Sequence, residues 1–210
     1  MTFRHPTEIA KAVEALEKDL LRDEGPQIST VRNYNFALLP YAPEDEFALR
    51  FAIHELSERL RDGGWTPDTV DLHALLLARL RAQGSDFLDA TIQREKSLAR
   101  TADPARAVRM LKERIVNLVE GPDGLAADVI RDIDRILGPN AKANRTVIFL
   151  GRAGSLYPFF RTSALLKHVA GHTRNTPVVL LYPGRIVGES GLSFMGILPA
   201  DRDYRPRIYR

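Results

Sequence analysis

Three apolar runs constrain the fold of this chain more than any other feature. They are residues 34–39 (YNFALL), 146–150 (TVIFL) and 177–182 (PVVLLY). A strand with one wet face alternates apolar and polar residues, whereas a strand covered by helices on both faces is apolar throughout. The runs have the length of strands and are flanked by prolines or glycines. The sequence therefore predicts parallel strands of an α/β sheet.

Helical segments connect these runs in the order typical of βαβ units. A helix expected at residues 43–63 connects the first run to a weaker strand at 66–72, and a helix expected at 155–169 connects the second run to the third. Such units are almost always right-handed, and we expect the two strands of each unit to lie side by side. Another helix is expected at residues 7–22. The apolar residues that continue the helix at 43–63 are Phe47, Leu49, Ile53, Leu56 and Leu60.

The segment between the two units, residues 73–140, has helical periodicity interrupted by capping residues and breakers. The chain has 210 residues, of which 44% are apolar, and this is enough for one α/β domain. We predict a single domain, residues 1–210, with a mostly parallel sheet of about four to five strands and residues 73–140 as an all-helical insert. Residues 204–209 contain Pro206, which is typical of an edge strand.

Composition excludes several classes of protein. Cysteine is absent, so the chain has neither a disulfide framework nor a thiol nucleophile. Lysine and arginine exceed the acidic residues by only 30 to 27, which is close to neutral for this length. No apolar stretch approaches the roughly 18 residues that a membrane helix needs. We therefore expect a cytoplasmic protein.

A glycine-containing segment follows the second apolar run at the position where phosphate-binding loops occur. Gly151 and Gly154 precede Ser155, but the glycines are too close for a Walker A loop and no lysine follows them. Arg152 and the amides near Ser155 are suited to contact an anion. The alternative is a sharp turn in which Ser155 caps the following helix. A degenerate nucleotide-binding domain therefore stays open as a second interpretation.

Side chains at the carboxyl ends of the strands are the candidates for binding a partner, because ligands of open α/β sheets bind there. Three segments should meet at this edge, residues 40–43, 151–155 and 182–184. In the helix start at 157–161, at least one of Tyr157, Phe160 and Arg161 should point outward. The predicted partner-binding residues are Arg152, Ser155, Tyr157, Phe160, Arg161, Tyr182 and Arg185.

We predict neither a catalytic residue nor a metal or cofactor site. No carboxylate or cysteine is placed to complete a set of metal ligands with His168 and His172. Asp68 and Asp71 lie near a strand end, but no strand of the other βαβ unit ends in acidic residues. The last nine residues include Arg202, Arg205, Arg207 and Arg210. Such a run is typical of a solvated edge, but contact with DNA phosphates through this tail is a third interpretation.

Several of these segments together carry a resemblance to a known family. The stretches "TVIFLGRAGSLYPFFRTSALLKHV", "TPVVLLYPG" and "GLSFMGILPADRDYRPRIY" are similar to the BrxB family, small components of bacteriophage-exclusion (BREX) defence systems. The resemblance implies a non-catalytic subunit that works beside an ATPase, a DNA methyltransferase and the alkaline-phosphatase-like protein PglZ. It further implies a role in host DNA modification and phage restriction, with PglZ as the expected partner. Separately, we expect any contact with DNA to be weak or indirect.

Overall fold

The computed structural model describes residues 6–29, 35–101, 103–121, 123–139, 142–159, 162–188, 191–200 and 206–210. The helices are α1 (Pro6–Leu20), α2 (Glu46–Asp62), α3 (Leu72–Arg81), α4 (Ser85–Thr101), α5 (Pro104–Val119), α6 (Leu125–Leu137) and α7 (Thr162–Val169). The strands are β1 (Phe36–Tyr41), β2 (Thr66–Asp71), β3 (Thr146–Gly151), β4 (Val178–Val187), β5 (Gly191–Phe194) and β6 (Arg207–Ile208). Short 3₁₀ turns occur at Pro43–Asp45 (η1), Ala143–Arg145 (η2), Ala153–Leu156 (η3) and Ala170–His172 (η4).

The strands form one sheet in the order β2-β3-β4-β1-β6, in which all neighbours are parallel. β5 lies outside this path and pairs antiparallel with the end of β4. This confirms the predicted α/β class with a mostly parallel sheet. The predicted edge position of the C-terminal segment is also confirmed, because β6 is the last strand in the order.

The two predicted βαβ units differ in how their strands are placed. β3 and β4 are neighbours connected through α7, as expected. β1 and β2 are both parallel members of the sheet, but β4 and β3 lie between them. The expectation that the strands of the first unit lie side by side is therefore wrong, because the later strands insert between them.

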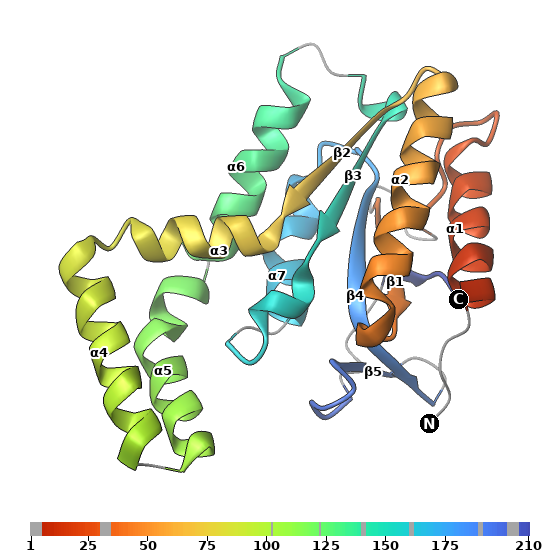
Figure 1. Ribbon diagram of the computed structural model, residues 1–210. Helices are drawn as coiled ribbons and strands as arrows, with labels where there is room; N and C mark the ends of the chain where they lie inside the picture. Colours follow the sequence, from red (N-terminus) through yellow and green to blue (C-terminus); the bar gives the residue numbers. More distant parts are fainter. Residues whose placement is uncertain are drawn as a thin grey trace.

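Helices cover both faces of the sheet, and each face has its own apolar core (Figure 1). α1 and α2 cover one face, where Leu16, Leu49 and Leu56 pack against Leu39 and Phe149. α6 and α7 cover the other face with α3 beside them. Successive residues of a strand point to opposite faces, and both faces are buried. This double burial explains why β1, β3 and β4 are apolar at consecutive positions.

Between β2 and β3 the described chain is helical, as predicted for residues 73–140. α6 is part of the main body, because Leu125, Val129 and Ile133 are buried against the sheet. In contrast, α4 and α5 form a helical hairpin that extends away from the sheet (Figure 1). The assignment of all 210 residues to a single domain stays a prediction.

Candidate functional site

Two adjoining cavities lie at the carboxyl edge of the sheet, between α2 and the ends of β2, β3 and β4. Their volumes are about 280 and 270 Å³, and both are lined by Glu46, Arg50 and Arg152. We call them together the rim groove. Pro43, Ser155 and Pro183 line the second cavity, so the three segments predicted to meet at this edge do meet there. The rest of the lining includes His54, Arg61, Thr69, Asp71, Gly151, Gly154, Leu181, Phe47 and Met195.

A hydrogen bond fixes the start of α2 at one end of the groove. The buried Tyr41 hydroxyl at the end of β1 donates to the Glu46 carboxylate. Burial, together with this hydrogen bond and the negative charge of Glu46, raises the pKa of Tyr41 above its usual value. The tyrosine is therefore a neutral donor, and Glu46 is held in place where the two cavities join.

Arginine side chains give the groove positive charge that is incompletely neutralised. The Arg152 Nε lies 4.0 Å from Asp71 Oδ2, and both side chains are 44% exposed. Asp71 is also occupied elsewhere, because its Oδ1 accepts a hydrogen bond from the Ala74 amide at the start of α3. Among the described residues, the Arg50 side chain has no hydrogen-bond or ion-pair partner. Two guanidinium groups therefore remain available to an anionic group of a ligand.

The glycine segment does not lead directly into a helix. Ala153–Leu156 forms a 3₁₀ turn, and the Ser155 hydroxyl donates to the Arg152 carbonyl at 2.8 Å. Tyr157 is extended, with ψ of 138°, and is followed by a cis peptide bond to Pro158. The residue before a proline disfavours helical backbone.

The helix predicted from residue 155 consequently begins at Thr162. Ser155 does not cap it, and no helix N-terminus lies at the glycines. The degenerate nucleotide site thereby loses the strand–turn–helix geometry on which that interpretation depended.

Among the predicted site residues, Arg152 and Ser155 lie in the rim groove, and Arg185 is exposed near it, 3.7 Å from Glu44. The others are placed differently. Tyr157 is half-buried, 6.4 Å from the Phe194 ring centre, and Phe194 also packs edge-on against Tyr182 at 5.5 Å.

Tyr182 is completely buried, and its hydroxyl donates to the Leu192 carbonyl at 3.3 Å. Its side chain belongs to the core beneath the edge, so we do not retain it as a contact residue. Phe160 and Arg161 lie outside the described residues.

The sequence analysis missed an exposed aromatic pair on α2. Phe47 is 80% exposed and Phe51 is 62% exposed, and Phe47 lines the groove. The sequence analysis grouped Phe47 with the other apolar residues of this helix and did not separate it from the buried ones. The buried apolar residues of α2 are Leu49, Ile53, Leu56 and Leu60. Phe47 lies two residues from Leu49, about 200° around the helix, and this spacing was the signal for exposure.

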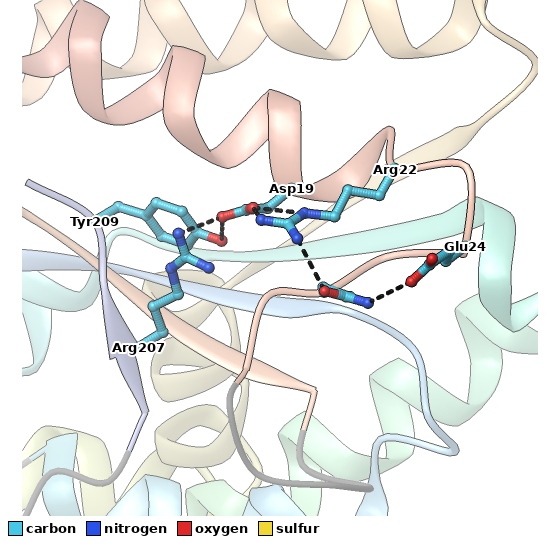
Figure 2. A network of polar contacts seen from close by, with 6 residues as sticks. Asp19, Arg22, Glu24, Arg207 and Tyr209 are labelled. Carbon is cyan, nitrogen blue, oxygen red and sulfur yellow. Dashed lines mark hydrogen bonds and ion pairs between the residues drawn. The ribbon is translucent and has the colours of Figure 1, made fainter.

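A second polar cluster, shown in Figure 2, includes Arg207 of the arginine tail. The Asp19 carboxylate of α1 is 3% exposed and forms ion pairs with Arg22 at 2.5 Å and with Arg207 at 2.6 Å. It also accepts a hydrogen bond from the Tyr209 hydroxyl at 3.1 Å. Arg207 is thus committed to an internal ion pair, which weakens the interpretation of the tail as a DNA-binding segment. Arg202 and Arg205 lie outside the described residues.

The described residues contain no group of three or more histidine, cysteine, aspartate or glutamate side chains placed to hold a metal ion. Over the same residues, every helix is too short or too polar to cross a lipid bilayer.

The fold defines the chain as an α/β protein whose parallel sheet is covered on both faces. A family model described as BREX protein BrxB matches residues 68–208, about two thirds of the chain. The chain therefore belongs to the BrxB family and is a component of a BREX phage-defence system, with other BREX components as its partners. No curated protein and no solved structure matches it.

The matched span includes Arg152, Ser155 and Arg185 but begins after α2. The groove therefore has one wall inside the family match and one wall, with Phe47 and Phe51, outside it.

Proposed function

We propose that this protein is a non-catalytic adaptor of a BREX assembly, which binds a PglZ-like protein at the rim groove and so supports DNA modification and phage restriction. The observation that carries the proposal is the exposure of Phe47 and Phe51 beside a groove lined by arginines. Aromatic and arginine side chains are the residues most enriched among those that dominate binding energies at protein interfaces. The proposal places the protein in the cytoplasm, where host DNA lies.

Exposure of this pair is costly in a chain that does not use it. Two phenylalanines four residues apart on a helix form one continuous apolar surface, and such surfaces favour association. Arg50 lies between them in sequence, and its unpaired guanidinium is available to an acidic group. The arrangement suits a partner segment that combines an apolar side chain with a carboxylate.

The binding experiment compares the unmodified chain with a Phe47→Ala/Phe51→Ala variant by titration against the PglZ-like protein encoded in the same defence system. Truncation of two interface anchors is expected to weaken binding by tenfold or more. The melting temperature should be unchanged, since neither ring is buried. Circular dichroism of both proteins checks the fold.

The matched control is a Leu21→Ala/Ile92→Ala variant, which removes two half-exposed apolar side chains at other places on the surface. It should bind like the unmodified chain. Unchanged affinity of the phenylalanine variant, or failure of the unmodified chain to bind the PglZ-like protein at all, would contradict the proposal.

A further inference from the structure

The α4–α5 hairpin contributes few residues to the two apolar cores of the main body. None of the residues that form or line the two apolar cores comes from α4 among the described residues, and α5 reaches the core only near its end, with Val119 and Leu118. The two helices are connected near their base instead. There the Arg114 Nε donates to the Thr91 hydroxyl at 2.6 Å, and its guanidinium lies 4.9 Å from the centre of the Phe87 ring. The hairpin is thus an ordered projection that the core does not require.

The outer part of this hairpin is strongly basic. We call residues 94–101 and 103–109 the hairpin tip. It contains five basic residues against two acidic ones, which gives it a net charge of +3. The whole chain has 30 basic and 27 acidic residues, so the rest is balanced at 25 to 25. The excess of basic residues in this one projecting element therefore equals the excess in the whole chain. Its basic residues are Arg94, Lys96, Arg100, Arg106 and Arg109.

These five side chains are exposed, and none has a hydrogen-bond or ion-pair partner in the part of the chain that the structure describes. The main body differs, because eight of its described arginines contact a carboxylate at 2.5–2.9 Å. One of the two acidic residues of the tip, Asp103, is used locally, since its carboxylate accepts from the Ala105 amide at the start of α5. A merely solvated helical surface typically alternates charges and pairs them. This one leaves its cations free to neutralise an external polyanion.

We propose that the hairpin tip binds the phosphate backbone of duplex DNA without reading its sequence. Paired helices that carry basic side chains can neutralise phosphates on both sides of a groove, and this neutralisation supplies sequence-independent affinity. The site differs from the arginine tail, which lies at β6, and from the rim groove. It gives the adaptor a second contact, to the DNA on which the assembly acts.

The geometry and composition of the tip favour duplex DNA over other polyanions. A helix with its side chains is about 10–12 Å across, and the major groove of B-form DNA is about 12 Å wide. The major groove of duplex RNA is too narrow and deep to admit such an element. Proteins that grip single strands stack aromatic side chains on the bases, and residues 94–109 contain no aromatic residue.

The experiment measures binding of the full chain to a labelled random-sequence duplex by fluorescence anisotropy, from about 50 to 200 mM salt. The slope of log affinity against log salt should be about −0.9 for each phosphate contacted. An Arg100→Gln/Arg106→Gln variant should bind about tenfold more weakly at low salt. Its slope should be shallower by about 1.8, since two contacts are lost. Glutamine is a good helix former, so circular dichroism should be unchanged.

The matched control is Arg131→Gln/Arg135→Gln on α6, which removes the same charge from side chains that are exposed but ion-paired to Asp128 and Asp132. It should retain the unmodified affinity and slope. The proposal is overturned if the unmodified chain does not bind the duplex at low salt. It is equally overturned if both variants lose affinity to the same extent, or if polyglutamate, single-stranded DNA or duplex RNA of equal charge binds more tightly than duplex DNA.

Discussion

The Tyr209 hydroxyl donates a hydrogen bond to the buried Asp19 carboxylate at 3.1 Å and thereby joins the C-terminal end of the chain to its first helix (Figure 2). Arg207 adds an ion pair to the same carboxylate at 2.6 Å, and its guanidinium lies 5.0 Å from the centre of the Tyr209 ring. A buried carboxylate is tolerated only with such partners. The edge strand β6 is short, so this network is a principal attachment of the tail to α1.

Removal of the Asp19 carboxylate is the first test of this attachment. We expect Asp19→Ala to lower the free energy of unfolding by about 2 kcal/mol, because it leaves the buried Tyr209 hydroxyl without its acceptor and two arginines without their counterion. Urea denaturation at neutral pH measures the change. Asp89→Ala, at an exposed position of α4, should stay within about 0.5 kcal/mol of the unmodified chain. Equal effects of the two substitutions would show that the network is dispensable.

Because two buried tyrosines have raised pKa values, we predict that the protein loses stability in alkaline solution. Burial raises the pKa of Tyr209 and of Tyr41, and their neighbours Asp19 and Glu46 act in the same direction. The positive charges of Arg207 and Arg22 oppose the rise in the pKa of Tyr209 but do not cancel it. A folded pKa above the unfolded value of about 10 means that the unfolded state loses its proton first as the pH rises. The stabilisation is therefore complete below pH 10 and declines above it, by about 1.4 kcal/mol per pH unit for each tyrosine.

The measurement is urea denaturation between about pH 9 and pH 11. A Tyr41→Phe/Tyr209→Phe variant has a lower stability at neutral pH but should lose less of it over this interval, since phenylalanine does not titrate. The tyrosines at other positions are common to both proteins and cancel in the difference. Parallel pH profiles of the two proteins would contradict the prediction.

The parts of the fold that could be predicted are those whose sequence signal lies within a few consecutive residues. The runs at β1, β3 and β4 indicated doubly covered strands because burial on both faces is recorded directly in consecutive apolar residues. Even the weak β2 segment was found, and its Pro67 is tolerated because β2 is an edge strand. The strand order was not predictable, since it depends on packing between segments more than 70 residues apart, such as β1 and β4.

The antiparallel pairing of β5 with β4 leads to a third prediction. A Cβ added to Gly184 would lie 2.3 Å from the Ser193 carbonyl oxygen and 2.5 Å from the Tyr182 ring. Backbone on one side and a buried ring on the other leave no room for adjustment. We expect Gly184→Ala to cost about 3 kcal/mol or more, measured by thermal or urea unfolding. Gly171→Ala is the control, because nothing lies within 4 Å of its added Cβ, and a comparable loss there would contradict this explanation.

The candidate site was predictable only where it depended on strand ends. Arg152 and Ser155 follow β3 directly, so the topology of a parallel sheet places them at the rim. Tyr157 and Tyr182 could not be assigned correctly to surface or core, because their burial results from the long-range pairing that places Phe194 between them. Phe47 illustrates a different limit. Its type favoured the core, and only its angular position relative to Leu49 and Ile53 indicated the surface.

Arg152 allows stability and partner binding to be separated at one position. Its φ of 59° lies in the left-handed region, where a residue with a Cβ costs about 1–2 kcal/mol. Arg152→Gly removes this strain. Glycine also increases the conformational entropy of the unfolded chain, which lowers the free energy of unfolding by about 0.4–1 kcal/mol. We therefore expect a net rise of about 0.5 kcal/mol or slightly more in the free energy of unfolding, together with about tenfold weaker binding to the PglZ-like protein, because the guanidinium of the rim groove is lost.

Arg152→Ala is the matched variant, since it removes the same guanidinium but keeps a Cβ in the left-handed conformation. It should bind the partner as weakly as Arg152→Gly while its free energy of unfolding stays close to that of the unmodified chain. Urea denaturation and titration with the partner, performed on all three proteins, give both quantities. If the alanine variant is as stable as the glycine variant, the backbone at residue 152 is not strained. If both bind with unmodified affinity, Arg152 is not part of the interface.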